Sequence, residues 1–484
     1  MHAADTDPSH QQIPLRNDFI ENGRFLQIPG PNPILRPPAD ENEWDGNIIE
    51  ACDAFKDFGT YYLYYHGSGK NDDYQIGVAT SKNPLGPFKK YEKNPILKIG
   101  PEGGWDGMYV ACAMVMKEGI DKYYMWYTGR NALGPAGERW DVGLATAPAP
   151  LDAWTPGRLD AWTPGRLDAW TPGRLDAWTP IEGNPLLENF GYVGGVVKVK
   201  GKYFLYGEHP RGIARDYGPL VLATADATEG PWTLYENNPA LKQGEPGEWD
   251  NGGISEAEVL YYGGVFHLFY SGTKPYNPRT LSRESVGYAF SYDGYNWSKY
   301  GLNPVASREQ NLNAAAFAEV HSIIEPPFVY VYHTLRYKAP WRPGDEKRFP
   351  WVEDLGVQVL VTHDDFSLEM PLINLQTLEP GKKQLLIETP PINLSGVKRL
   401  ALTAQCTYTS RAKKPIRLQV MSSPNGLTFD TKPLYVFKHD LIKGQTVRET
   451  FEVNTNVKYI KVLVENPDKQ ATVSDLEVIA TLGS

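Results

Sequence analysis

Tyr61-Tyr62-Leu63-Tyr64-Tyr65 is the first of five similar stretches that recur along the chain. Each is a short run of aromatic and branched apolar residues of the kind that favours β-strands. Their central residues are Leu63, Met125, Leu205, Leu268 and Val331. The successive spacings of these residues are 62, 80, 63 and 63. Repetition at such a period is typical of architectures in which every repeat is one supersecondary unit.

The long second interval contains a tandem duplication. Residues 151–174 consist of three identical octamers with the sequence Leu-Asp-Ala-Trp-Thr-Pro-Gly-Arg, and without them the interval returns close to the common period. A packed core could not absorb such an insertion, so we expect a surface loop between two repeats. The alternative is an arm that stacks on sugars through the tryptophans, which are Trp154, Trp162, Trp170 and Trp178.

Each repeat divides into four strands separated by turns. In the first repeat they are expected at Ile48–Phe55, Thr60–Tyr65, Tyr74–Thr80 and Phe88–Tyr91. Five repeats of four antiparallel strands predict an all-β fold, a five-bladed β-propeller. A strand near 24–28 resembles the outer strands of the repeats, and it is expected to help close the ring.

The pattern changes after Gly381, where several alternating strands follow one another. They are expected at Leu385–Glu388, Arg399–Thr407, Ile416–Ser422, Thr446–Val453, Tyr459–Val464 and near Thr472–Thr481. This pattern is typical of a β-sandwich. The predicted organisation is an N-terminal extension over 1–23, a catalytic propeller over 24–380 with the loop insertion at 151–174, and an accessory β-sandwich over 381–484.

Charge and composition exclude several partners. The chain has 48 Lys and Arg against 58 Asp and Glu, a net charge of −10, which does not favour nucleic acid or an anionic membrane. The sequence has no apolar run of about 18 residues, so no membrane span is expected. No signal peptide is visible, and localisation stays open between secreted or periplasmic, if a signal was removed, and cytoplasmic. The sequence leaves the oligomeric state open.

The cysteines are interpreted as structural. The three cysteines, Cys52, Cys112 and Cys406, form no disulfide or zinc-binding pattern, and we expect them to be buried small hydrophobic residues.

A repeated Trp-Asp dipeptide is also interpreted as structural. It precedes three repeats, at Trp44, Trp105 and Trp249. We expect its Asp to tie a turn and its Trp to pack between blades.

Carboxylates gather at the predicted starts of the inner strands, which line the channel of a propeller. Counting back from the five central apolar residues gives Glu50, Ala111, Tyr192, Glu256 and Glu319. Slightly deeper in the same strands lie Asp53, Glu258 and His321. Charged residues are rare on packed inner strands unless they are paired or functional. Because the first, fourth and fifth blades are neighbours in a closed ring, Glu50, Glu256 and Glu319 are expected to meet.

The loops after the second strands supply hydrogen-bonding and cationic groups at the same mouth. They carry His66, Arg130, His209, Arg211, Lys274 and Arg336. Together with Tyr192, these groups around carboxylates suit the binding of a sugar, especially an anionic one. Each of them taken singly is more often an ordinary surface residue.

With these residues in view, the chain resembles the five-bladed propeller glycosidases, namely glycoside hydrolase families 43, 32 and 117 and, more distantly, the mannoside phosphorylases of family 130. Glu50-Ala-Cys-Asp-Ala-Phe55 followed by Tyr61–Tyr65 looks like their acid-bearing inner strand. His321 with Val331-Tyr-His333 resembles the last blade of family 43, whose channel His often helps to hold calcium. Those families usually carry acids in blades one, two and three, whereas Ala111 and Tyr192 stand in the second and third blades here.

The resemblance implies a glycosidase that acts on a carbohydrate by paired-carboxylate chemistry and requires no cofactor. Glu50, Glu256 and Glu319 are the expected catalytic residues, with Asp53 and Glu258 as substitutes if the strand register shifts. His321 either helps to bind a calcium ion or pairs with a channel carboxylate such as Glu319, since the two would share one strand face. The alternatives are a glycoside phosphorylase, whose phosphate would be held by Arg130, His209, Arg211 and Lys274, and a propeller that binds glycans without catalysis.

Overall fold

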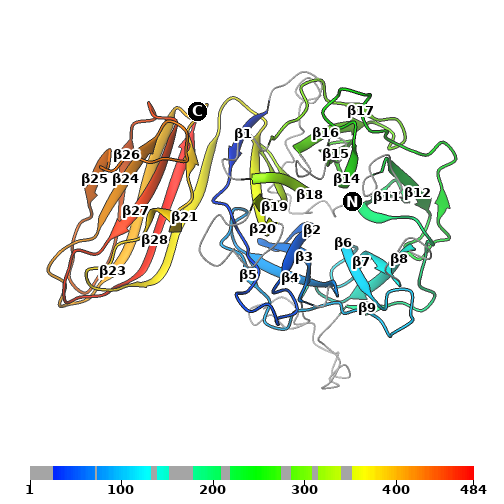
Figure 1. Cartoon of the computed structure of the whole chain (residues 1–484), viewed down its shortest axis with the longest axis horizontal. Helices are drawn as coiled ribbons and strands as arrows, with labels where there is room; N and C mark the ends of the chain where they lie inside the picture. The colour runs from blue at the N-terminus through cyan, green and yellow to red at the C-terminus, as the bar shows by residue number, and fades with distance from the viewer. Residues whose placement is uncertain are drawn as a thin grey trace.

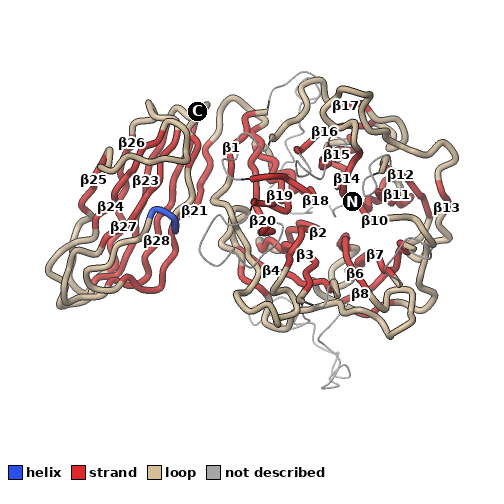
Figure 2. The backbone as a smooth tube through the Cα atoms, in the orientation of Figure 1, coloured by secondary structure: helices blue, strands red, loops and turns tan. Residues whose placement is uncertain are grey.

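The computed structural model describes residues 25–70, 73–131, 139–151, 178–208, 218–273, 285–307, 314–338 and 351–484. These residues form seven four-stranded antiparallel sheets. Five sheets surround a common centre and the other two lie beside the ring (Figure 1). Strands dominate the described chain, with one short helical turn in the second domain (Figure 2). The predicted fold, a five-bladed β-propeller followed by a β-sandwich, is confirmed.

Each blade runs outward from the central channel in chain order, apart from the last. Blade one contains β2 (Ile48–Asp57), β3 (Thr60–Ser68), β4 (Gln75–Ser81) and β5 (Lys89–Lys90). Blade two contains β6 (Tyr109–Lys117), β7 (Tyr123–Arg130), β8 (Trp140–Ala147) and β9 (Thr179–Pro180). Blade three contains β10 (Tyr192–Val199), β11 (Lys202–Glu208), β12 (Leu220–Ala225) and β13 (Thr233–Leu234). Blade four contains β14 (Gly253–Tyr262), β15 (Val265–Thr273), β16 (Ser285–Ser291) and β17 (Ser298–Lys299).

Blade five joins the two ends of the propeller chain. Its inner strands are β18 (Ala314–Glu325), β19 (Phe328–Lys338) and β20 (Trp351–Val361), and its outer strand is β1 (Leu26–Pro29). Leu26 pairs with Val361 in an antiparallel register. The predicted ring-closing role of the first strand is therefore confirmed.

Apolar clusters fill the interfaces between neighbouring blades. Trp44, Trp105 and Trp249 of the Trp-Asp dipeptides pack against three of these clusters. Trp44 stacks on Tyr65 at a ring separation of 5.7 Å, and the Tyr65 hydroxyl donates to Asp45 at 2.9 Å. The same Tyr–Asp bond recurs in blades two and four. A Cβ at Gly77 would lie 2.7 Å from the Trp44 ring, so this close packing requires glycine.

The second domain has two four-stranded sheets. One contains β21 (Ser367–Leu378), β28 (Val473–Gly483), β23 (Arg399–Tyr408) and β26 (Thr446–Val453). The other contains β22 (Ile392–Asn393), β27 (Tyr459–Glu465), β24 (Arg417–Ser423) and β25 (Tyr435–Lys438). The change of strand pattern after Gly381 predicts a domain boundary at 380, but β21, which precedes that point, pairs with β28 inside the sandwich.

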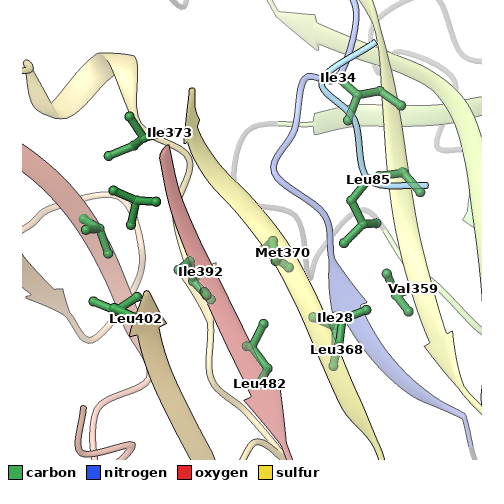
Figure 3. Packing of buried hydrophobic residues seen from close by; sticks show 14 of the residues in the cluster. Ile28, Ile34, Leu85, Val359, Leu368, Met370, Ile373, Ile392, Leu402 and Leu482 are labelled. Carbon is green, nitrogen blue, oxygen red and sulfur yellow. The ribbon is translucent and has the colours of Figure 1, made fainter. Parts of the chain in front are cut away.

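One predicted sandwich strand is wrong. Residues Leu386–Glu388 form a 3₁₀ turn because the Glu388 carboxylate accepts the backbone N–H of Leu385 at 2.8 Å. The sandwich packs directly on the propeller, where Leu368 and Met370 of β21 lie beside Ile28 of β1 (Figure 3). Within the described part of the chain, no helix has the length and apolar character that crossing a bilayer requires.

Candidate active site

Every inner strand of the propeller contains a β-bulge opposite nearly the same point of its second strand. The first residues of the five bulges, in blade order, are Cys52, Cys112, Gly194, Glu256 and Glu319. A bulge bends its strand and redirects a side chain. Cys112 and Glu319 adopt the left-handed backbone conformation, with φ of 51° and 45°, which is uncommon outside glycine. Blades four and five therefore present carboxylates at the bulge, and blades one and two present thiols.

Arg336 gathers three carboxylates at the channel mouth. Its Nη2 donates to Oε1 of Glu50 at 2.9 Å and to Oε1 of Glu319 at 3.0 Å. Its Nε donates to Oε1 of Glu353 at 2.6 Å. The structure thus brings together Glu50 and Glu319, as the sequence predicted. Arg336, which was predicted to bind substrate, has carboxylates of the protein as its partners here.

His66 holds Glu50 from the other side. Its Nε2 lies 2.7 Å from Oε2 of Glu50, and its Nδ1 lies 3.0 Å from Sγ of Cys52. Burial on its own would raise the pKa of Glu50, but the hydrogen bonds and positive charge of His66 and Arg336 lower that pKa to about 2. Glu50 is therefore an ionised carboxylate across the physiological pH range. His66, another predicted substrate-binding residue, is buried against these partners.

Glu256 has the opposite environment. Burial, with the negative charge of Glu50 adding to it, raises the pKa of Glu256 to about 7, against a smaller lowering by His66 and Arg336. The thiol of Cys112 donates to Oε1 at 3.1 Å, and Oε2 has no hydrogen-bond partner among the described residues. Glu256 is thus a carboxyl group that holds its proton close to neutral pH.

A second cluster lies deeper in the same strands. Asp53, Glu258 and His321 have polar atoms within 4.8 Å of one another, and all three are buried. Burial raises the pKa of Asp53 to about 7, raises that of Glu258, and lowers that of His321 to about 3. Asp53 and Glu258 also accept the backbone N–H groups of Val115 and Ser322. These two acids therefore lie in the interior rather than at the mouth.

The expected pairing of His321 with Glu319 is not seen. The bulge between Ala318 and His321 interrupts the strand alternation on which that expectation depended. The calcium expectation stays a prediction, and the residues present do not match it well. Calcium takes six to eight oxygen ligands. This cluster offers two carboxylates, each already holding a backbone N–H, and an imidazole with no hydrogen-bond partner among the described residues.

A row of neighbouring aromatic side chains extends over blades one to three. Tyr74 lies 5.3 Å from the His66 ring and 4.8 Å from Tyr109. The Arg130 guanidinium lies 5.2 Å from the ring of Trp140, which in turn lies 6.1 Å from Tyr192. Arg130 and Tyr192, both predicted to bind substrate, therefore belong to one continuous wall. A cation held over aromatic faces is a stable arrangement.

Several predicted residues lie outside the described part of the chain. They are His209, Arg211, Lys274 and residues 152–174 of the octamers. Of the four tryptophans of that loop, Trp178 is described, and it is buried in the core between blades one and two. The cysteines are free and buried as expected, but Cys52 and Cys112 contact polar groups rather than apolar ones alone.

Sequence reasoning missed several residues of the site. They are Tyr74, Tyr109, Trp140, Glu208, Glu353 and the hydrogen-bonding role of Cys112. Glu208 carried a usable signal, because it stands three residues after Leu205 just as His66 stands three residues after Leu63. Tyr74 and Tyr109 carried none, since the sequence contains 29 tyrosines.

The chain is similar in sequence to a known protein over only part of its length. No family model matches the chain. Over 86 residues the chain is 34% identical to a xylosidase/arabinosidase of Bacteroides ovatus, and the match spans 18% of this chain and 23% of that protein. The chain therefore matches less than a quarter of the length of that relative.

Among solved structures, the chain is similar to a family 32 beta-fructofuranosidase of Bombyx mori, at 12% identity, a TM-score of 0.44 and coverage of 96% of this chain and 94% of that one. It is also similar to a family 117 glycoside hydrolase of Zobellia galactanivorans, at 16% identity, a TM-score of 0.45 and coverage of 70% and 91%. A glycosyl hydrolase of Bacteroides ovatus is similar at 17% identity and a TM-score of 0.43, with coverage of 68% and 91%.

Proposed function

We propose that this protein is a glycoside hydrolase whose active site is the channel mouth of blades one, four and five. The observation that carries this proposal is the contrast between Glu50 and Glu256, which share one site while their pKa values are shifted in opposite directions. Glycoside hydrolysis needs a carboxylic acid to protonate the leaving oxygen and a carboxylate that stays ionised. Environments that separate two carboxyl pKa values supply such a pair.

In this proposal Glu256 is the general acid. It keeps its proton near neutral pH, and its Oε2 has no partner among the described residues, which leaves that oxygen available to a glycosidic oxygen. Glu50 is the ionised carboxylate. A carboxylate with a pKa of about 2 is a weak proton acceptor. The role of Glu50 is therefore to stabilise the positive charge that develops at the anomeric carbon. Arg336 holds Glu50 through one ion pair and Glu319 through another, so its positive charge is shared by the two carboxylates.

The aromatic wall is the proposed sugar-binding surface. Tyr109 and Tyr192 offer rings on which the apolar face of a sugar can stack, and Arg130 adds a cation beside them. The curated relative is named for xylosidase and arabinosidase activity, so xylosides and arabinosides are the first substrates to test. No cofactor takes part in this chemistry.

An activity screen tests the proposal. Wild-type protein is assayed on aryl xylosides and arabinosides and on plant, algal and fructan oligosaccharides, with and without inorganic phosphate. We expect hydrolysis without phosphate, and Glu256→Gln and Glu50→Gln should each lower kcat about 100-fold or more with little change in the thermal midpoint. Glu325→Gln is the matched control, since Glu325 lies at the far end of β18 and bonds Tyr61. Turnover that needs phosphate indicates the phosphorylase instead, and binding without turnover indicates a glycan-binding protein.

A further inference from the structure

A set of buried polar side chains repeats around the propeller. Each stands three residues after the central apolar residue of a second strand, and the five are His66, Thr128, Glu208, Ser271 and Thr334. All of them are between 0 and 2% exposed. Buried polar groups are costly unless they are hydrogen-bonded, so a polar residue at this point in every blade needs a partner.

Four of these side chains bond the backbone of the next inner strand in the ring, and the fifth, His66, lies close to it. The N–H of Cys112 lies 3.4 Å from Nδ1 of His66, and the N–H of Val193 donates to Thr128 at 3.0 Å. The N–H of Glu256 donates to Oε2 of Glu208 at 3.0 Å.

The remaining two contacts complete the circle. Ser271 donates its hydroxyl to the carbonyl of Phe317 at 2.8 Å, and the N–H of Ala51 donates to Thr334 at 2.9 Å. Blades two to five thus each bond the next blade, with blade five bonding blade one, and His66 of blade one contacts blade two. We call these five side chains the interblade ring.

The interblade ring attaches at or beside the bulges. Its contact to blade four is made at Glu256 itself, whose backbone N–H bonds Glu208 while its side chain bonds Cys112 at 3.1 Å. A bulge leaves a residue out of the strand ladder, so its backbone needs another partner to be held in one place. Glu208 also accepts the N–H of Gly218 at 3.3 Å, which ties the same carboxylate to blade three.

Closure of the ring alone does not explain why blade three uses a carboxylate. A hydroxyl makes the equivalent contact in blades two, four and five, and burying a carboxylate costs more than burying a hydroxyl. A carboxylate accepts a backbone N–H more strongly than a neutral oxygen does. The stronger acceptor lies where the residue held is the proposed general acid.

We propose that Glu208 is a positioning residue, which fixes the bulge of blade four so that the carboxyl group of Glu256 is held in its working place. This inference rests on the proposed glycosidase function. Glu208 acts through the backbone of Glu256, so its loss should lower kcat more than it changes KM. A displacement of about 1 Å at a catalytic group is enough to lower turnover about 100-fold.

The test compares Glu208→Ala, Glu208→Gln and the matched control Thr128→Val. Thr128→Val removes the equivalent contact to blade three, whose bulge carries Gly194 and no acid. We expect Glu208→Ala to lower kcat about 100-fold with KM within about threefold. Glu208→Gln keeps an oxygen acceptor, so most of the kcat that Glu208→Ala loses should be retained in this variant. Thr128→Val should lower the thermal midpoint by a similar amount to Glu208→Ala while keeping kcat within about twofold of wild type.

Two results would overturn the inference. One is an equal loss of kcat in Glu208→Ala and Thr128→Val, which would mean that both residues only close the ring. The other is a Glu208→Gln variant as inactive as Glu208→Ala, which would give Glu208 a role in the chemistry through its charge. Hydrogen exchange supplies a readout without activity: the amide of Glu256 should exchange faster in Glu208→Ala and keep its wild-type rate in Thr128→Val. If wild type hydrolyses nothing, the proposed function fails, and the exchange rates still decide whether Glu208 holds Glu256.

Discussion

Nε2 of His66 lies 2.7 Å from Oε2 of Glu50, and the two residues face each other directly across strands β2 and β3. Because His66 helps to lower the pKa of Glu50 to about 2, its removal should raise that pKa. We predict that His66→Phe moves the acidic limb of the pH profile of kcat/KM to higher pH. His267→Phe is the matched control, since His267 is also buried on a second strand but bonds Tyr288. An acidic limb that stays in place in His66→Phe contradicts this prediction.

The buried acid Asp53 should make stability depend on pH. Its pKa in the folded protein is about 7, above the ordinary 3.8, so the folded state holds a proton that the unfolded chain releases. Stability contributed by that proton is present at low pH and is lost as pH rises towards 7. We predict that Asp53→Asn, which keeps an acceptor for the N–H of Val115, raises the thermal midpoint more at pH 8 than at pH 5. A decrease of equal size at both pH values would mean that the carboxyl group is needed for packing alone.

Chelation should leave activity unchanged. The cluster of Asp53, Glu258 and His321 does not offer the oxygen-rich ligand set that calcium prefers. We predict that dialysis against EDTA changes neither kcat nor the thermal midpoint, and that protein purified without chelator contains no stoichiometric calcium by elemental analysis. Loss of activity that calcium restores would assign a bound cation to this cluster.

The duplicated octamers should be dispensable. Deleting residues 151–174 leaves the final partial copy, Leu175–Pro180, which retains the buried Trp178 of the blade interface. We predict an unchanged thermal midpoint and kcat/KM within about twofold of wild type, because surface loops tolerate changes in length. A large rise in KM after the deletion would make the octamers part of the substrate site.

Much of the fold was predictable because its signal repeats. The apolar–aromatic stretch around Leu63 has four equivalents, and their common period implies the blades. The outer strand at Leu26–Pro29 was found by its likeness to other outer strands. The turn at Leu386–Glu388 was missed because a local bond to the Glu388 carboxylate outweighs the β preference of the short apolar run Leu385-Leu386-Ile387.

The site was predictable only where it depends on strand position. Glu50, Glu256 and Glu319 follow from counting along the inner strands, but the bulges that redirect them have no marker in the sequence. Arg336 was found by its position in a loop, whereas its three carboxylate partners come from strands distant in sequence. Cys112 was interpreted by composition, and its contact with Glu256 crosses from blade two to blade four.

The pH profile of kcat/KM for wild type and Glu256→Gln on one hydrolysed aryl glycoside tests the central claim most directly. With Glu256 as the general acid at a pKa of about 7, wild-type activity should fall as pH rises through about 7, because the acid loses its proton. In Glu256→Gln the residual activity should lack that alkaline limb. A wild-type profile that stays level to pH 9, or a Glu256→Gln variant that keeps both the wild-type rate and the same limb, would contradict the assignment of Glu256 as the acid.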